Sequence, residues 1–332
     1  MPVKLAVVGL GIGRAHVDLF TKTPGAEVVA LCDTNEAVLA EVGAACGART
    51  YTSYDAMLEA ESLDAVSLCT PPKLHAPMTE AAAERGIHVL CEKPMASSVA
   101  DCQRMIDACA AANVKLMIAL KKRFAPQYDL VRKLCAEQGD QPLWACARFA
   151  LGRVDKDWFW DDTDGGGPLL ENSVHMVDIL CCLMGRVVRV SAEGGTLFMK
   201  HRAPVADAAA VTLRFASGGV AALGLGYGCE WSMAREELLL ATPTMVFEIQ
   251  GGFDRGDQLR YCRRDNPNDI TTHIAEAPYQ GGFPEEMAHF IHCITHDEEA
   301  AADGIAGRES VRVCLAIKES IRTGQPVTLP SP

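Results

Sequence analysis

The sequence predicts an α/β fold in two domains. A doubly wound parallel sheet is expected over residues 1–121, and an α+β domain with a large, mostly antiparallel sheet over residues 122–332. The chain has 332 residues, about twice the length of a typical domain. Its first third alternates short apolar runs with helical patterns, and longer runs of alternating polar and apolar residues follow.

The first 121 residues carry five strand patterns and four helix patterns. The strands are predicted at residues 3–9, 26–33, 63–70, 87–92 and 114–120, and the helices at residues 14–22, 35–47, 75–86 and 97–113. Serines open the last of these helices, and glycines end the second and third, as is typical of helix ends. Because strands that alternate with helices run parallel, this pattern predicts the doubly wound sheet.

The remainder of the chain has the texture of an antiparallel sheet. Long strand patterns lie within residues 142–152, 187–198, 208–228, 236–252 and 258–264, and tight glycine or proline turns join them. Ser217, Gly218 and Gly219 form a typical hairpin turn. Three helices, over residues 167–184, 284–298 and 307–323, are expected to cover one face of the sheet.

Composition narrows the possible partners. The net charge of −12 disfavours nucleic acid, because an acidic chain repels phosphate backbones. No apolar run approaches the roughly 18 residues of a membrane span, and the N-terminus has no leader pattern. The 14 cysteines are scattered without a CxxC pair. We therefore expect reduced, mostly buried cysteines and a cytoplasmic location, with neither nucleic acid nor membrane as a partner.

A glycine-rich loop joins the first predicted strand to the first helix. Its sequence "GLGIGR" contains Gly9, Gly11, Ile12, Gly13 and Arg14. Glycines here allow a pyrophosphate to approach the backbone, as in Rossmann domains, although glycine also serves ordinary tight turns. Asp33 ends the second strand, where a carboxylate would accept from the ribose hydroxyls of NAD and repel the 2′-phosphate of NADP. Asp33 could also cap the following helix. Arg14 stands where a third small residue is usual, and it keeps NADP open as the less favoured cofactor.

Further motifs make the chain resemble the Gfo/Idh/MocA family, which is typified by glucose–fructose oxidoreductase and inositol dehydrogenase. The matching pieces, which together span nearly the whole chain, are Thr70-Pro71 with His75, Gly86, Glu92-Lys93-Pro94, Arg123-Phe124, "DWFWDD", "GGGPLLENSVHMVD" and the tail from Gly307. The resemblance implies an NAD-binding Rossmann domain in which Thr70, Pro71 and His75 also contact the cofactor. It further implies a homodimer or homotetramer built on the second-domain sheet.

The stretch "CEKPMA" holds the most specific of these motifs. An ion pair at the end of a strand is the ordinary explanation of an adjacent Glu and Lys. The resemblance implies instead that Glu92 faces the cofactor ribose, that Lys93 contacts both cofactor and substrate, and that the Lys93–Pro94 peptide bond is cis. A lysine ammonium beside a reacting oxygen would stabilise developing negative charge.

The second-domain candidates lie in "ENSVHMVD". Glu171, His175 and Asp178 are four and three residues apart, which predicts one helical face. The resemblance implies that His175 is the general base, a role for which the ordinary pKa of histidine is suited. Relatives often carry aspartate where this chain has Glu171, which could orient His175, bind a substrate hydroxyl or do both. Asn172 and Asp178 are expected to bind substrate.

Three other sets of residues have side chains that could belong to a site. Arg123 is expected to bind substrate by resemblance, whereas Lys121 and Lys122 are expected to be solvated. Trp160 could form a flat wall for a sugar ring or pack in the core. Glu285, His289, His292 and His296 share one helical stripe, but a single helix offers a metal about two ligands, so no metal site is predicted.

These observations favour an NAD-dependent oxidoreductase that acts on a secondary hydroxyl of a sugar, sugar acid or cyclic polyol. One alternative is a glycoside hydrolase or lyase that uses tightly bound NAD transiently. Another is a non-catalytic sensor that binds a nucleotide and a partner protein. Lys93 and His175 argue against the sensor, and release of free NADH would separate the first two.

Overall fold

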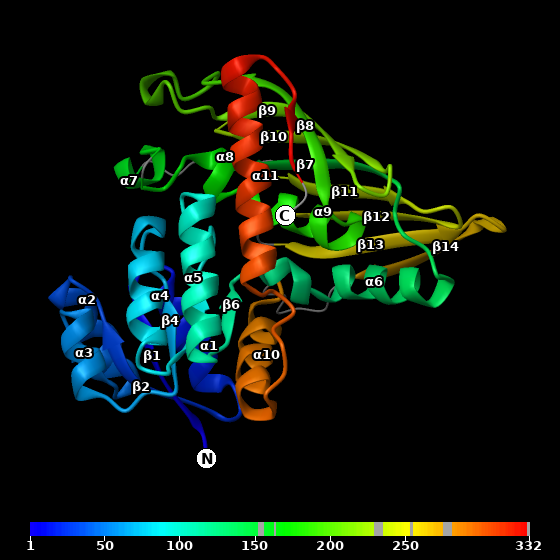
Figure 1. Ribbon diagram of the computed structural model, residues 1–332. Helices are drawn as coiled ribbons and strands as arrows, with labels where there is room; N and C mark the ends of the chain where they lie inside the picture. Colours follow the sequence, from blue (N-terminus) through cyan, green and yellow to red (C-terminus); the bar gives the residue numbers. More distant parts are fainter. Residues whose placement is uncertain (152–155, 163, 229–234, 253–254, 275–280, 331–332) are drawn as a thin grey trace. The chain divides into compact units, whose positions relative to one another are not determined.

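The structure is a computed structural model that describes residues 1–151, 156–162, 164–228, 235–252, 255–274 and 281–330 (Figure 1). The chain forms two units. One comprises Met1–Lys121 with Phe283–Arg308, and the other comprises Lys122–Gly282 with Glu309–Pro332. Each unit is built around its own sheet.

The first unit contains a six-stranded parallel sheet in the order β3-β2-β1-β4-β5-β6. Its strands are β1 (Val3–Val8), β2 (Ala26–Cys32), β3 (Arg49–Tyr51), β4 (Ala65–Leu68), β5 (His88–Cys91) and β6 (Leu116–Ile118). This confirms the predicted parallel sheet. The short edge strand β3 was not predicted, because its three residues carry no continuous apolar run.

Helices pack on this sheet in neighbouring pairs, with α1 beside α10 and α4 beside α5 (Figure 1). The helices of the unit are α1 (Gly13–Lys22), α2 (Glu36–Cys46), α3 (Tyr54–Ala60), the 3₁₀ turn η1 (Pro72–Leu74), α4 (His75–Ala83), α5 (Val99–Ala112) and α10 (Phe283–His296). Helix α5 begins as predicted, with the Ser98 hydroxyl accepting from the Asp101 N–H at 3.1 Å. The short helix α3 was not predicted.

The second unit contains a nine-stranded sheet in the order β14-β13-β12-β11-β7-β10-β9-β8-β15. All neighbouring pairs are antiparallel except β7 with β10, so the prediction of a mostly antiparallel sheet is confirmed. The strands are β7 (Trp144–Leu151), β8 (Val187–Gly195), β9 (Ala208–Phe215), β10 (Val220–Tyr227), β11 (Arg235–Ala241), β12 (Met245–Gly252), β13 (Arg255–Arg263), β14 (Asn266–Ile274) and β15 (Val327–Thr328).

Several helical segments of this unit differ from prediction. They are the 3₁₀ turns η2 (Lys121–Phe124) and η3 (Lys200–Arg202), with α6 (Pro126–Gln138), α7 (Asp157–Trp160), α8 (Pro168–Glu171) and α9 (Val174–Met184), and α11 (Gly304–Thr323) also contributes. Helix α6 was missed, although Pro126 at its start and Gly139 after its end are typical boundary residues. The single helix expected over 167–184 is instead two helices.

Helix α10 belongs to the first unit by its packing, whereas the sequence analysis placed residues 283–308 in the second domain. The reason is apolar packing. The buried ring of Phe290 meets the buried ring of Phe20 on α1 edge to face, with centroids 6.5 Å apart. The face of α10 that carries His292 and His296 is exposed.

The cysteines that the structure describes are free thiols, and most are buried. Burial is the largest influence on Cys91, Cys109 and Cys314, and it raises the pKa of each thiol, so these side chains remain protonated at neutral pH. None of the helices in the described ranges is long and apolar enough to cross a membrane.

Candidate active site

The first-unit candidates meet at the carboxyl edge of the parallel sheet. The glycine loop follows β1, Asp33 follows β2, Thr70 lies after β4 and Glu92 directly follows β5. Strands β2, β1, β4 and β5 are consecutive neighbours, so their ends lie side by side. This edge is where open parallel sheets bind their ligands.

The glycine loop has the properties that a pyrophosphate site requires. Gly9 has φ +86°, and a Cβ there would lie 2.7 Å from the carbonyl oxygen of Cys69. A Cβ on Gly13 would lie 3.0 Å from the Val7 side chain, so glycine allows α1 to approach the sheet closely. A Cβ on Gly11 would meet no atom within 4 Å, which leaves the backbone there open to a ligand. Ile12 beside it is 47% exposed. The residues present therefore fit a dinucleotide at the start of α1.

Asp33 is tied to the same loop. One carboxylate oxygen accepts from the N–H of Leu10 at 2.6 Å, and the other accepts from the N–H of Asn35 at 2.8 Å. The capping role considered for Asp33 is wrong, because Asn35 caps α2 by accepting from the N–H groups of Ala37 and Val38. Asp33 thus holds the glycine loop while its half-buried carboxylate stays at the sheet edge.

Arg14 is engaged by a carboxylate on the neighbouring helix. Its guanidinium donates to both oxygens of Glu41 on α2, at 2.6 and 2.9 Å. The hydrogen bond and charge of Glu41 raise the pKa of Arg14, and the same pairing lowers the pKa of Glu41. Both side chains are exposed, so the pair is a modest restraint on Arg14.

The Glu92-Lys93-Pro94 segment is a turn held from inside. The Lys93–Pro94 peptide bond is cis, which confirms that part of the resemblance. Glu92 is 6% exposed. One of its oxygens lies 3.0 Å from Nε2 of His16, and the other accepts from the N–H of Lys93 at 3.0 Å. Burial acts to raise the pKa of Glu92, but the hydrogen bond and charge of His16, with Lys93, outweigh it and lower the pKa. A contact of Glu92 with the cofactor ribose stays a prediction.

His75 joins two loops of this edge. Its Nε2 lies 2.8 Å from the carbonyl oxygen of Thr70, and its Nδ1 lies 3.1 and 3.2 Å from the carbonyl oxygens of Pro94 and Met95. The ring is fully buried, and burial lowers its pKa against the effect of these carbonyls. His75 thus connects Thr70-Pro71 to the turn, while its contact with the cofactor stays a prediction.

Sequence reasoning missed His16. It lies on α1 four residues before the buried Phe20, so it occupies a core-facing position of that helix. A histidine in an apolar stripe just after a glycine loop was the available signal. Its partner Glu92 is 76 residues away, which local patterns do not reveal.

In the second unit the predicted helical face is interrupted. Glu171 ends α8, and His175 and Asp178 lie on α9. The N–H and the hydroxyl of Ser173 both donate to the carbonyl oxygen of Pro168, at 3.1 and 3.2 Å, instead of following a regular helical ladder. Placing Glu171 on the same helix as His175 was therefore wrong, and Asn172 lies at the junction.

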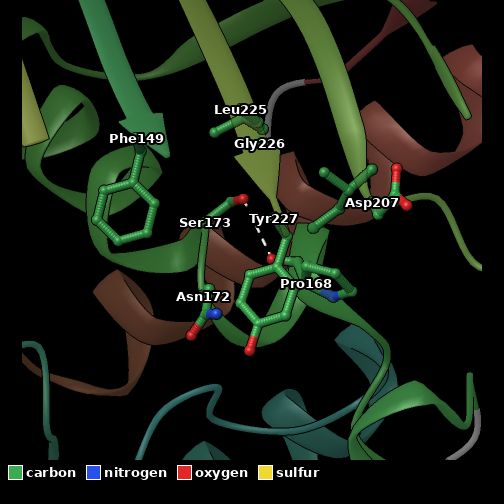
Figure 2. Close-up of a pocket in the computed structure, with 9 residues that line it drawn as sticks. Phe149, Pro168, Asn172, Ser173, Asp207, Leu225, Gly226 and Tyr227 are labelled. Carbon is green, nitrogen blue, oxygen red and sulfur yellow. Dashed lines mark hydrogen bonds between the residues drawn. The ribbon is translucent and has the colours of Figure 1, made fainter. Parts of the chain in front are cut away.

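A small pocket adjoins this junction (Figure 2). Asn172, Ser173, Asp207 and Tyr227 line it together with apolar residues. The Tyr227 ring stacks on Phe159, with centroids 5.3 Å apart, and meets Trp160 edge to face. Trp160 is 5% exposed, so it packs in this aromatic cluster as the second of its two expected roles describes. Contacts of Trp160 and Asn172 with substrate stay predictions.

Arg123 and Asp178, both expected at substrate, are bonded to each other. The Arg123 guanidinium donates to both oxygens of Asp178, at 2.8 and 2.7 Å, and the Ser310 hydroxyl donates to the same carboxylate at 2.9 Å. Asp178 is 1% exposed. Burial acts to lower the pKa of Arg123, but Asp178 outweighs it and raises the pKa. The expectation of a solvated Lys122 was wrong, since this residue is buried and paired with Glu236.

Removing the Asp178 carboxylate should destabilise the protein. Asp178→Ala removes the carboxylate that pairs with the buried Arg123 charge, and breaking a buried ion pair costs about 3–5 kcal/mol. The matched control is Ser310→Ala, which removes a single hydroxyl donor from the same cluster and should cost only about 1 kcal/mol. Denaturant unfolding measures both. Equal stability of Asp178→Ala and the unaltered protein would contradict a structural role for Asp178 and would favour the expected role in substrate binding.

The histidine stripe of α10 makes contacts of its own. His292 lies 3.2 Å from a carboxylate oxygen of Glu298, and its ring stacks on that of His296. Nε2 of His289 accepts from the N–H of Ala301 at 3.0 Å. Over the part of the chain that the structure describes, no three His, Cys, Asp or Glu side chains gather as a metal site would require.

Comparisons with known proteins agree with this geometry. The model of an oxidoreductase family with an NAD-binding Rossmann fold matches residues 3–120, and that of an oxidoreductase-family C-terminal alpha/beta domain matches residues 146–329. D-apiose dehydrogenase of Paraburkholderia graminis is 28% identical, with 99% of this chain and 90% of the relative aligned. Myo-inositol 2-dehydrogenase of Thermotoga maritima is 26% identical, with 98% of each chain aligned.

A solved structure shares the whole fold. The WlbA dehydrogenase of Bordetella pertussis, in complex with NADH and UDP-GlcNAcA, superimposes with a TM-score of 0.85. It is 27% identical, and the match covers 100% of this chain and 98% of that one. Because family models match residues 3–120 and 146–329 in chain order, the resemblance of the sequence motifs is confirmed. The chain belongs to the Gfo/Idh/MocA family of oxidoreductases.

Proposed function

We propose that the protein is an NAD-dependent dehydrogenase that interconverts a secondary hydroxyl and a carbonyl on a sugar, sugar acid or cyclic polyol. The observation that carries this proposal is the common edge of the parallel sheet. There the open glycine loop, the Asp33 carboxylate and the Glu92-Lys93 turn follow neighbouring strands. Relatives named as apiose and inositol dehydrogenases support the substrate class.

In this proposal the loop from Gly9 to Arg14 binds the pyrophosphate, and Asp33 accepts from the adenosine ribose. NAD supplies the hydride acceptor when it is bound. Lys93 contacts the reacting oxygen of the substrate, where its ammonium stabilises negative charge as the hydroxyl loses its proton. His175 accepts that proton, and Glu171 and Asn172 orient the base or the substrate.

A substrate panel tests the function directly. The purified protein is mixed with NAD and with aldoses, sugar acids and inositols in turn, and absorbance at the NADH band is followed. Steady formation of free NADH with one of these compounds is expected. Formation of a sugar product without free NADH would favour a hydrolase or lyase with retained cofactor. Binding of NAD without turnover of any panel member would contradict the proposal.

Asp33 should decide between NAD and NADP. Asp33→Asn keeps a side-chain oxygen for the Leu10 N–H but removes the charge that would repel a 2′-phosphate. A hydrogen bond to a charged group contributes about 1.5–3 kcal/mol, so the preference for NAD should fall by about tenfold or more. Titrations of both cofactors measure this ratio.

A second variant and a stability measurement serve as controls for the change in cofactor preference. Asp33→Ser also loses the reach to Leu10 and to the ribose, so any extra loss of NAD affinity relative to Asp33→Asn reports on these two contacts together. Thermal unfolding of both variants checks that the loop is intact. If the unaltered protein already binds NADP as tightly as NAD, the proposed role of Asp33 fails.

A further inference from the structure

A buried chain of polar groups runs beneath the Glu92-Lys93 turn. Nδ1 of His16 lies 2.8 Å from the Ser67 hydroxyl on β4, and Nε2 lies 3.0 Å from the Glu92 carboxylate. The Ser67 hydroxyl lies 3.7 Å from the Cys69 sulfur. His16 and Ser67 are almost fully buried. Buried polar groups are costly unless paired, so this chain fixes the side chains that it joins.

The chain connects the first helix to the turn that carries Lys93. His16 holds one oxygen of Glu92, and the N–H of Lys93 donates to the other oxygen. A carboxylate held on both oxygens has one orientation, and through its second oxygen it restrains the backbone of Lys93. The His16 ring is itself clamped edge to face by Phe20 of α1 and Phe283 of α10.

We propose that His16 is a positioning residue that holds Glu92 from inside the sheet and thereby sets the direction of Lys93. This inference rests on the proposed role of Lys93 at the reacting oxygen. In this inference His16, which follows the glycine loop, both packs α1 on the sheet and orients the Glu92-Lys93 turn.

The charge state of the pair follows from its surroundings. The groups that face His16 are Ser67 on β4, Cys69 after β4 and Glu92 after β5, with Lys93 beside Glu92. Burial, the largest influence, acts to lower the pKa of His16, but Cys69 and Glu92 raise it well above its usual value of 6.5. The pKa of Glu92 is lowered by the same contact. A charged imidazolium donates from both ring nitrogens, which satisfies Ser67 and Glu92 together.

The sign of the pH effect follows. Because the folded pKa of His16 is raised, its stabilising effect is complete below pH 6.5 and fades as the pH rises through the folded value. Because the pKa of Glu92 is lowered in the folded protein, its stabilising effect is complete above the usual pKa of 4.5 and is lost as the pH falls through the folded value. The pair therefore stabilises the turn most between these two ordinary values.

Two amide substitutions separate positioning from packing. The amide nitrogen of glutamine in His16→Gln can replace Nε2 as a donor to Glu92, whereas that of asparagine in His16→Asn replaces only Nδ1. His16→Asn should lower kcat by about 10- to 100-fold with a much smaller change in NAD affinity, because a misplaced catalytic group slows the chemical step. His16→Gln should recover most of kcat. The control is His88→Asn at the opposite, amino end of β5, which should leave kcat unchanged.

A second measurement needs no substrate. Nuclear magnetic resonance of ring-labelled histidine, with His16→Asn used for assignment, follows the protonation of His16. The ring should remain charged above pH 6.5 in the unaltered protein, and it should become neutral in Glu92→Gln. A ring that is neutral at pH 6.5, or whose charge depends on Cys69 and not on Glu92, would overturn the inference.

The two proposals fail in different ways. If Lys93→Ala keeps normal turnover, the proposed role of Lys93 fails, whatever the state of His16. If Lys93→Ala is inactive but His16→Asn and His16→Gln share normal kcat and reduced thermal stability, His16 only packs α1. Equal losses of kcat in both amide variants would also overturn the inference, since glutamine retains the donor to Glu92.

Discussion

Replacing Lys93 by alanine should reduce turnover by about 10²–10³, as expected when one well-placed electrostatic donor is lost from a site that excludes water. If Lys93 acts on the reacting oxygen and not on the cofactor, the dissociation constant of NAD should change little, because the proposed pyrophosphate and adenosine-ribose contacts come from the glycine loop and Asp33. The measurements are NAD titration by fluorescence and initial rates on the substrate that the panel identifies. Lowered kcat with retained NAD affinity would place Lys93 at the reacting oxygen.

Two further variants sharpen that test. Lys93→Arg keeps the charge but replaces a compact ammonium with a planar fork, so it should not restore turnover. Lys22→Ala removes an exposed lysine that pairs with Asp18 on the same helix, and it should leave the rate unchanged. Near-normal turnover in Lys93→Ala would make the turn a structural element, and the proposed chemistry would fail.

Replacing His175 by alanine should remove the general base and lower the rate of alcohol oxidation by about 10²–10⁴. With the base present, the rate should fall on the acid side as the imidazole becomes protonated and can no longer accept the substrate proton. In His175→Ala this acid limb should disappear, and the remaining rate should rise with hydroxide concentration.

The measurement is the pH profile of kcat/KM, which reports the groups of the free enzyme. His201→Ala on η3 removes an exposed histidine of the same unit and should preserve both the rate and the acid limb. A His175→Ala protein that retains both would transfer the base to another residue, with Lys93 as the next candidate.

Local patterns were sufficient for most of the fold. The period of the apolar runs identified the parallel and antiparallel sheets, whereas the close contacts of Gly9 and Gly13 within the protein became evident only in the structure. Helix α6 could have been found from its terminal Pro126 and Gly139. The three-residue strand β3 could not, because it is too short to show a period.

Pairings across long stretches of chain account for what remained hidden. Arg123 bonds Asp178 55 residues later, and His16 bonds Glu92 76 residues later, so neither partner follows from spacing. The interruption between α8 and α9 depends on two hydrogen bonds that the N–H and the hydroxyl of Ser173 donate to the Pro168 carbonyl oxygen. The apolar pattern of the sequence does not predict these bonds. The sequence therefore identified the candidate residues, whereas the hydrogen bonds and ion pairs between them could be seen only in the structure.

Residues 283–308 belong to the first unit although they follow most of the second unit in the chain. This affects the design of chimaeras made from two related genes. Family models divide the chain into contiguous halves, yet the packing of the cofactor half draws on two separate stretches. In a chimaera with a crossover after Lys121, Phe20 would come from one parent and Phe290 from the other. Lys121 and the Phe283 ring, which its ammonium overlies at 4.0 Å, would likewise come from different parents. The cofactor half is inherited as a working module only when both stretches come from the same parent.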